Sequence, residues 1–357
     1  MAVRVGIIGI DGHQREWLDA LVALREAGEI ELVGIGHRSA AAARDTAEVL
    51  KALGPPLAHP SAHAYDDLRV LIQEKSPQVL IMDRPPNATM DFLLGCIEQE
   101  IAIFSLGPPV ETFAEARALA EVLGLRSRLL YIFPRFADSE ALKRCAQAEE
   151  FIRPIRFASA SWLGLNHALL RGKESPPATP HALPVRSLSV LAWDAIATFI
   201  RLIGVPTTIY TAVRGTVGAG NSFADLSGAA ALTLRFADDA AATVALCDRI
   251  PPGTQSERQL LLWGAQGTLR LDQESYVYHD MEGKLIDRGD MGNRQRSPVS
   301  EAVESLRQFL SQLALPDSPL VGWELHLEEI AAVMEALVVS HRTGEAESPE
   351  HFRHLRR

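Results

Sequence analysis

The chain lacks an excess of positive charge and any long apolar run. Its 35 Lys and Arg residues are outnumbered by 45 Asp and Glu residues, which leaves a formal net charge of −10. We expect no general binding to nucleic acid or to anionic membranes, because such partners need a basic field. No apolar stretch reaches the length of about 18 residues that a membrane-spanning helix requires, so we also expect no membrane segment.

Cysteine is scarce as well. The three cysteines, Cys96, Cys145 and Cys247, are far apart and form no CxxC pair. This spacing favours reduced thiols in a cytoplasmic protein and excludes a disulfide framework or a cysteine-based zinc site. No metal-binding cluster and no Ser–His–Asp arrangement stands out, so we predict no metal. The chain enters an apolar run at Val3 without the layout of a signal peptide.

What the first 133 residues do contain is a regular alternation of apolar runs and amphipathic stretches, which predicts strands and helices in turn. The expected strands are Val3–Ile8, Glu31–Gly36, Val79–Met82, Ile101–Ser105 and Leu129–Phe133, with a weak one near Pro56–His59. The expected helices are Glu16–Ala27, Ala40–Leu53, Tyr65–Glu74, Thr89–Gln99 and Phe113–Leu123. This alternation is typical of a parallel sheet covered on both faces. We predict an α/β protein whose residues 1–133 form a Rossmann-like, doubly wound domain.

After residue 133 the pattern changes to strands of period two joined by short turns. The expected strands are Ile155–Trp162, Thr207–Arg214, Gly228–Phe236, Ala241–Asp248, Glu257–Trp263 and Thr268–Asp272. The expected helices are Asp138–Glu150, Leu188–Ile203, Ala302–Leu313 and Trp323–His341, and the expected loops are Leu163–Arg186 and Gly283–Ser297. Residues 134–345 are thus predicted to form a C-terminal α+β domain with a large, mostly antiparallel sheet, followed by a frayed tail at 346–357. One free sheet face predicts a homodimer or higher homo-oligomer.

The glycine-rich turn Gly9–Gly12 joins the first strand to the first helix. In a dinucleotide-binding domain such a turn holds the pyrophosphate at the N-terminus of the helix. Here Asp11 occupies the place of a glycine, and its carboxylate would repel a phosphate. Asp11 can instead cap the helix, which leaves Gly12 and His13 facing the phosphate. A strand–helix junction without a ligand is the alternative.

Further short segments occur in a defined order along the chain. They are Pro86-Asn87, Leu106-Gly107-Pro108, Tyr131–Phe136, Ile203–Pro206 and the hairpin turn Gly264–Leu269. With the opening turn, they make the chain resemble the glucose–fructose oxidoreductase, inositol dehydrogenase and rhizopine-catabolism (Gfo/Idh/MocA) family over nearly its whole length. The resemblance implies NAD or NADP as cofactor, and hydride transfer to or from a sugar, an inositol or a related polyol.

The family's catalytic positions hold other residues in this chain. The family lysine that steadies the reacting group is replaced by Gly107, and the acid/base histidine, counted back from Gly204, is replaced by Asp194. Further polar positions of the family hold Met90, Val190 and Ala197. Apart from Asp194, these residues cannot transfer a proton near neutral pH. Two hypotheses follow: an NAD(P)-dependent oxidoreductase acting on a small sugar-like or polyol substrate, or a catalytically silent relative that binds a nucleotide or sugar as a sensor, regulatory subunit or scaffold.

For catalysis, the best candidate is Asp194, an ionisable residue within an apolar helix. A carboxylate there must be paired, neutral or facing a cleft. It is therefore either an acid/base or substrate contact, or a structural partner of Arg186. His167 and His181, on the long loop, are candidates to replace the missing proton donor, and the alternative is that both are simply solvated.

For the cofactor, the resemblance adds residues at the ends of the predicted strands. His37 and Arg38 suit the 2′-phosphate of NADP, with a solvated loop as the alternative. Asn87, after Pro86, either contacts the cofactor or only caps the next helix. Gly107 and Pro108 occupy the positions that, by the resemblance, lie beside the nicotinamide in the family. Arg135, at the domain junction, is a candidate for an anionic group of substrate or cofactor.

Overall fold

The computed structural model describes residues 2–10, 15–36, 63–65, 67–83, 89–133, 136, 152–164, 187–217, 222–223, 226–248, 257–272, 275–290, 298–314 and 326–354. The elements predicted at Ala40–Leu53, Pro56–His59 and Asp138–Glu150 lie outside these residues. The chain divides into two compact units, each described by itself below. Unit 1 comprises Met1–Pro109, Arg117–Phe133 and Gln295–Leu325; unit 2 comprises Val110–Ala116, Pro134–Arg294 and His326–Arg357.

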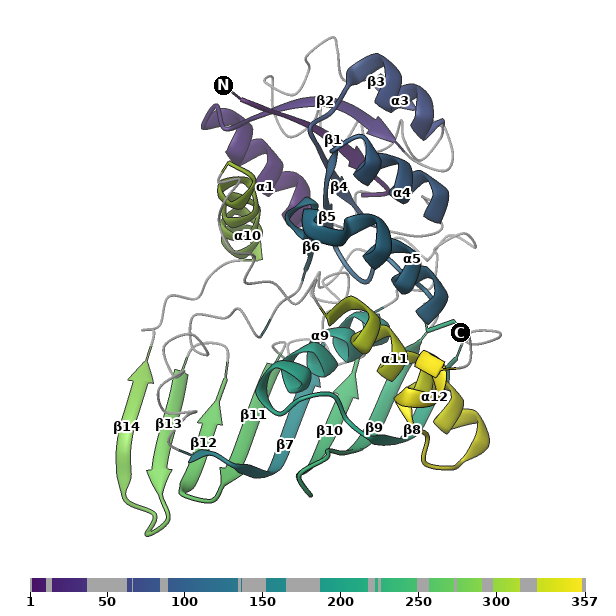
Figure 1. The fold of residues 1–357 in the computed structure, drawn as a ribbon. Helices are drawn as coiled ribbons and strands as arrows, with labels where there is room; N and C mark the ends of the chain where they lie inside the picture. The colour runs from purple at the N-terminus through teal and green to yellow at the C-terminus, as the bar shows by residue number, and fades with distance from the viewer. Residues whose placement is uncertain are drawn as a thin grey trace. The chain divides into compact units, whose positions relative to one another are not determined.

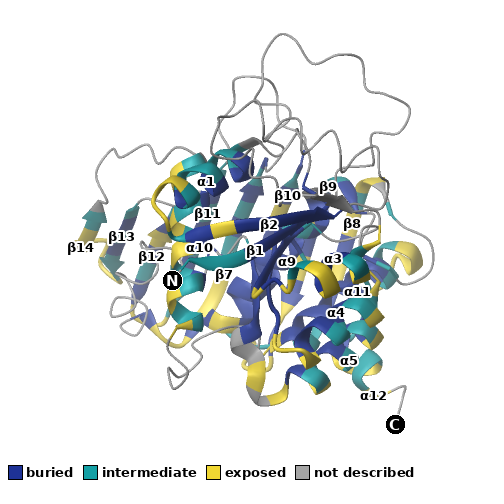
Figure 2. Cartoon of the chain, turned by 90° about the horizontal axis from the view of Figure 1, so that it is seen from above, coloured by how far each residue is buried: buried dark blue, intermediate teal, exposed yellow. Residues whose placement is uncertain are grey.

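Unit 1 contains a six-stranded sheet in the order β3-β2-β1-β4-β5-β6, in which all neighbouring strands are parallel (Figure 1). The strands are β1 (Val3–Ile8), β2 (Ile30–Gly36), β3 (His63–Tyr65), β4 (Val79–Met82), β5 (Ala102–Ser105) and β6 (Leu130–Ile132). The doubly wound, Rossmann-like prediction is confirmed. All residues of β4 and β5 are buried, and Figure 2 shows β1 and β2 mostly in the colour of buried residues. Such continuous burial is expected when helices cover both faces of a parallel sheet.

Some helices of unit 1 begin where a polar side chain accepts a hydrogen bond from one of their first N–H groups. The helical segments are α1 (Arg15–Glu26), α3 (Leu68–Lys75), α4 (Met90–Glu98), α5 (Phe113–Leu123, shared with unit 2), the 3-10 helix η2 (Gly124–Leu129) and α10 (Pro298–Leu313). Asp67 accepts a hydrogen bond from Arg69 N and caps α3. The predicted start of this helix at Tyr65 was therefore too early, because Tyr65 ends β3.

Helix α10 belongs to unit 1 although it lies far along the chain. It packs against α1 and β5, and Figure 1 shows α1 and α10 on one side of the sheet with α3 and α4 on the other. Its Phe309 contacts the rings of Phe104 and Tyr131 in an aromatic core that also includes Trp17. The units therefore interleave along the sequence, and they do not follow the linear boundaries 1–133, 134–345 and 346–357.

Unit 2 contains an eight-stranded sheet in the order β14-β13-β12-β11-β7-β10-β9-β8. The strands are β7 (Ile155–Leu163), β8 (Thr208–Thr216), β9 (Ser227–Arg235), β10 (Ala241–Cys247), β11 (Glu257–Gly264), β12 (Gly267–Leu271), β13 (Ser275–Asp280) and β14 (Leu285–Asp290). Only β7 and β10 pair in parallel, so the prediction of a mostly antiparallel sheet is confirmed. The loop predicted at Gly283–Ser297 was wrong in part, because β14 occupies its first half.

One face of this sheet is covered by α9 (Ser187–Leu202) and α11 (Leu327–Thr343) (Figure 1). Along β9 the residues facing the helices, such as Leu232, are buried, whereas Ala231 and Thr233 on the other face are exposed. The predicted tail is also partly folded: α12 (Pro349–His354) packs on α11, and Glu347 exchanges two backbone hydrogen bonds with Ile209. No helix within the described ranges is long and apolar enough to cross a membrane.

Candidate functional site

The carboxyl edge of the parallel sheet in unit 1 is the first part of the candidate site. Gly9 follows β1 with φ +73°, a left-handed conformation that glycine adopts without strain, and its N–H donates to Gly36 O at 3.0 Å. On the other side of β1, Asp83 N donates to Ile8 O at 3.0 Å. The strand order reverses here, since β1 has β2 on one side and β4 on the other. Doubly wound sheets bind ligands outside the carboxyl ends of their strands at such a switch point.

The turn after β5 offers backbone groups to this edge. Leu106 N donates to Met82 O at 2.8 Å, and the buried Ser105 hydroxyl donates to Gly107 O at 2.6 Å. Gly107 is itself buried and Pro108 is half-buried. These bonds fix the turn, while the position at which the resemblance implies a lysine carries no side chain. The turn can position a ligand through its main chain, but Gly107 cannot supply a proton.

Asp194 lies inside unit 2, where its side chain is 1% exposed. Its Oδ1 accepts a hydrogen bond from Phe136 N at 2.7 Å. Its Oδ2 accepts one from Trp162 Nε1 at 2.9 Å and lies 3.2 Å from Arg258 Nε. A buried carboxylate needs this kind of compensation, because an unpaired charge in the interior is strongly unfavourable. The contacts favour the structural alternative for Asp194, with Arg258 as its ion-pair partner, and the acid/base role stays a prediction.

Arg258 and Asp83 are polar residues that the sequence interpretation missed. Arg258 is 7% exposed and stands on the helix-facing side of β11, two residues before the buried Leu260 and on the same face as Leu260 and Leu262. In a strand whose residues alternate between buried and exposed, a charged residue at a buried position indicates a buried ion pair. Asp83 follows the apolar β4 directly, at the carboxyl edge where ligand-binding side chains occur.

Most of the other predicted site residues lie outside the described ranges. These are Asp11, Gly12, His13, His37, Arg38, Pro86, Asn87, Arg135, His167 and His181. The structure brings Gly9 and the Gly107 turn to one edge of the same sheet, and it places Asp194 in unit 2. Three further positions named by the resemblance carry apolar side chains: Met90 starts α4, and Val190 and Ala197 lie on α9.

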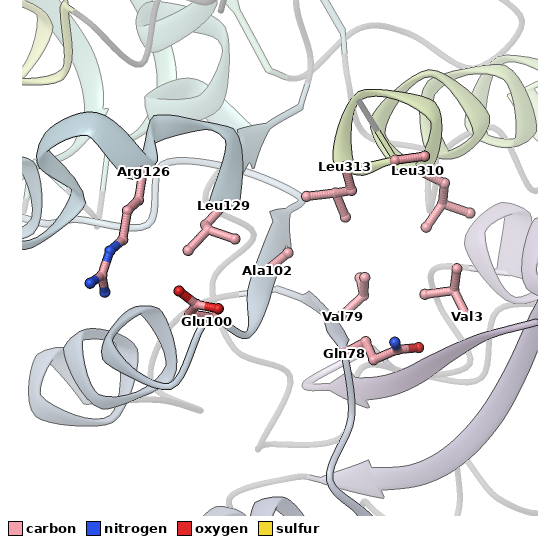
Figure 3. Close-up of a pocket in the computed structure, with 10 residues that line it drawn as sticks. Val3, Gln78, Val79, Glu100, Ala102, Arg126, Leu129, Leu310 and Leu313 are labelled. Carbon is pink, nitrogen blue, oxygen red and sulfur yellow. The ribbon is translucent and has the colours of Figure 1, made fainter. Parts of the chain in front are cut away.

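A cavity of about 300 Å³ lies at the opposite edge of the sheet in unit 1 (Figure 3). Val3, Val79 and Ala102, which line it, are the first residues of three parallel strands, so the cavity is at the amino edge. Leu310 and Leu313 of α10 extend its apolar wall, and the figure shows Glu100 and Arg126 together at one end. The cavity is therefore distinct from the carboxyl edge at which a nucleotide is expected.

The two sheets, their strand orders and their covering helices define a fold class: a Rossmann-type parallel sheet and a second unit with an open, mostly antiparallel sheet. No family model and no curated protein matches the sequence. Solved structures do match: levoglucosan dehydrogenase in complex with NADH and L-sorbose has a TM-score of 0.72 at 14% identity, over 98% of this chain and 99% of that one. The fold prediction is thereby confirmed.

Two further structures agree in fold. UDP-N-acetylglucosamine 3-dehydrogenase GnnA from Acidithiobacillus ferrooxidans has a TM-score of 0.66 at 16% identity, over 96% of this chain and 99% of that one. GenD2 from gentamicin A biosynthesis, in complex with NAD, has a TM-score of 0.69 at 14% identity, over 97% of this chain and 96% of that one. Two of these three structures are complexes with NAD or NADH. At this level of identity the likeness establishes the fold.

Proposed function

We propose that the protein binds NAD or NADP at the carboxyl edge of the parallel sheet and acts as an oxidoreductase on a small sugar-like or polyol substrate. The observation that carries the proposal is the switch point at β1, where Gly9 follows the strand with φ +73° and α1 begins six residues later, at Arg15. A helix that starts there directs free N–H groups and its positive dipole end toward a phosphate. The NAD-bound neighbours of the same fold support this choice of ligand.

In the proposed complex, Gly9, Gly12 and His13 receive the pyrophosphate, and Asp11 caps α1. Asn87, Gly107 and Pro108 lie along the nicotinamide half, and Arg135 binds an anionic group. His37 and Arg38 follow β2, where a Rossmann domain contacts the adenosine ribose, and an arginine there favours a 2′-phosphate. Both NAD and NADP are therefore proposed, NADP for the case in which Arg38 contacts the cofactor. A comparison of wild-type protein with Arg38→Ala tests this, because the variant should lose affinity for NADPH and keep its affinity for NADH.

Thermal unfolding with NADH and with NADPH is the first experiment. A ligand present at about 100 times its Kd stabilises the native state by about 2.7 kcal/mol, which is a shift of several degrees for a protein of this size. An upward shift with either nucleotide supports the proposal. Unchanged unfolding with both would exclude the cofactor-dependent functions together.

Turnover is tested separately, by following oxidation of the reduced cofactor across a panel of sugars and keto-polyols. If Asp194 transfers a proton, Asp194→Asn abolishes turnover while NADH binding persists. His167→Ala and His181→Ala test the loop histidines in the same way. Turnover that survives all three changes would remove these residues from the mechanism.

One observation favours the second candidate, a catalytically silent protein that binds a nucleotide or sugar. Both oxygens of Asp194 are held by groups inside unit 2, and Gly107 has no side chain to offer a substrate. Cofactor binding without turnover on any panel substrate would support a sensor, regulatory or scaffold role. Sustained turnover would exclude it.

We also propose that the chain forms a homodimer or larger homo-oligomer through the open face of the eight-stranded sheet. Small side chains pair across the middle of this face: Ala231 opposes Ala245 and Ala212, and Thr243 opposes Ser159. Phe157 and Tyr210 add exposed aromatic area, at 37% and 46% exposure. A flat face of small and aromatic side chains suits packing against a second sheet. A cytoplasmic location remains a prediction from the cysteine content.

A further inference from the structure

The chain passes from one unit to the other several times. Beside two of these crossings, a backbone N–H of unit 2 donates a hydrogen bond to a buried carboxylate. Residues Val110–Ala116 belong to unit 2, while Arg117–Phe133 belong to unit 1, so α5 starts in one unit and ends in the other. The chain returns to unit 2 at Pro134. In unit 2, the first turn of α5 and the returning chain are each bonded to a buried carboxylate.

Glu335 of α11 holds the start of α5. It is 8% exposed, and its Oε2 accepts a hydrogen bond from Phe113 N at 2.9 Å. Phe113 is the first residue of α5, so its N–H has no acceptor within the helix. The carboxylate supplies that acceptor, and its negative charge interacts favourably with the positive end of the helix dipole. Nearby, Phe223 N donates to Glu111 O at 3.1 Å and ties the preceding residues to the same unit.

Asp194 of α9 holds the returning chain at Phe136, three residues into unit 2. The Phe136 ring also packs edge-on against the Trp162 ring, with centroids 5.3 Å apart. Trp162 and Arg258 are directly paired neighbours on β7 and β11, and both contact Asp194 Oδ2. One carboxylate therefore joins α9, two strands and the incoming chain.

We infer that Glu335 and Asp194 are positioning residues that fix the two crossing segments onto unit 2. Each is a nearly inaccessible acid, and each accepts a backbone N–H from a residue next to a crossing rather than from its own helix. At these two crossings, the anchors confine any local change of the backbone to the residues after Phe113 and before Phe136. This role does not depend on the proposed function, since it needs neither cofactor nor substrate.

Hydrogen–deuterium exchange of the full-length protein without cofactor tests the Glu335 anchor. Glu335→Ala should speed exchange at Phe113 by about tenfold to a hundredfold, the effect of losing one hydrogen bond to a charged group. Glu335→Gln is the matched control, because its amide oxygen can still accept from Phe113 N, and it should leave exchange near the wild-type rate. Equal acceleration in α11 and β8 would show general destabilisation and overturn the inference, as would no change at Phe113.

The Asp194 anchor needs a different control, because removing Asp194 alone leaves Arg258 buried without its partner. Arg258→Met should be compared with the double variant Asp194→Ala/Arg258→Met, which differs only in the carboxylate. The double variant should exchange faster at Phe136 by at least about tenfold, relative to peptides of β9 and β10. An unchanged ratio would overturn the role of Asp194. Adding NADH to the same samples tests the proposed function separately, since the anchors are measured without it.

Discussion

The two sheets show opposite ways of hiding a sheet from solvent. The parallel sheet of unit 1 is covered on both faces, so successive residues such as Leu80 and Ile81 are both buried. The sheet of unit 2 is covered on one face, so Leu232 is buried and its neighbour Thr233 is exposed. In the proposed function, unit 1 presents its strand ends to a ligand, whereas unit 2 presents its open sheet face to a second copy of the chain. We therefore expect a small molecule to bind at the strand ends of unit 1 and a protein partner to bind at the open sheet face of unit 2.

The largest expected effect on stability comes from removing a buried ion pair in unit 2, compared with removing an exposed ion pair in unit 1. Asp194→Ala in unit 2 breaks a buried ion pair and should lower the free energy of unfolding by about 3–5 kcal/mol. In unit 1, Arg307 and Glu29 form an ion pair with side chains 49% and 33% exposed, so Arg307→Ala should cost at most about 1 kcal/mol. Urea unfolding followed by circular dichroism measures both. Equal losses would mean that burial does not set the strength of these pairs.

The second prediction compares strands residue by residue. Leu80→Ala and Ile81→Ala in β4 should each destabilise the protein by about 2–5 kcal/mol, because each side chain leaves a core cavity. In β9, Leu232→Ala should have a similar effect, whereas Thr233→Ala should change stability by at most about 0.5 kcal/mol. Denaturant unfolding of the four variants gives the comparison. A large loss for Thr233→Ala in dilute protein would show that the open face is covered within the monomer.

The open face itself is tested by placing a charge in its centre. Ala231→Glu should convert the proposed oligomer to a monomer, because a desolvated carboxylate between packed sheets is strongly unfavourable. Gln73→Glu, on the exposed surface of α3, adds the same charge and should leave the mass unchanged. Sedimentation velocity at several concentrations distinguishes them. An Ala231→Glu protein that keeps the wild-type mass would place the contact elsewhere.

The smallest expected effect is on thiol reactivity. Burial raises the pKa of the Cys96 thiol to about 12, so it stays protonated and unreactive between pH 7 and pH 9. Cys247 is half-buried, and its register with Ala229 places it on the open face. Peptide mapping after brief iodoacetamide treatment at pH 8 should find Cys247 modified before Cys96. Labelling of Cys247 should quicken further in Ala231→Glu; similar rates at Cys96 and Cys247 would contradict the assignment.

Much of the fold was predictable because local patterns and long-range packing agree. The bounds of β1 and α5 match the predicted ones, since apolar periodicity and a Thr112–Glu115 capping interaction define them locally. The edge strand β14 was missed because it is short and Asp287 and Arg288 interrupt its apolar pattern, while its apolar residues Leu285 and Ile286 are exposed. Charged residues on an edge strand protect a sheet from pairing with other chains.

The candidate site was predictable only in part. The sequence singled out Asp194 as an isolated acid in an apolar helix, and the structure shows why it is tolerated there. Its partners Phe136, Trp162 and Arg258 lie 58, 32 and 64 residues away along the chain, so no local pattern connects them. Gly9 could be recognised from the sequence because its role depends on the backbone conformation of one turn, which is a local property.

The interleaving of unit 1 has a consequence for how the protein is made. Phe309 completes the aromatic core around Phe104 and Tyr131, yet it is synthesised nearly 180 residues after Tyr131. Because domains fold as the chain emerges from the ribosome, the parallel sheet must wait, with one face incompletely covered, until α10 appears. Most of unit 2 is synthesised during that interval. The unit that begins at the N-terminus is therefore completed only near the end of translation. Until then its aromatic residues are exposed, and a chaperone can bind them.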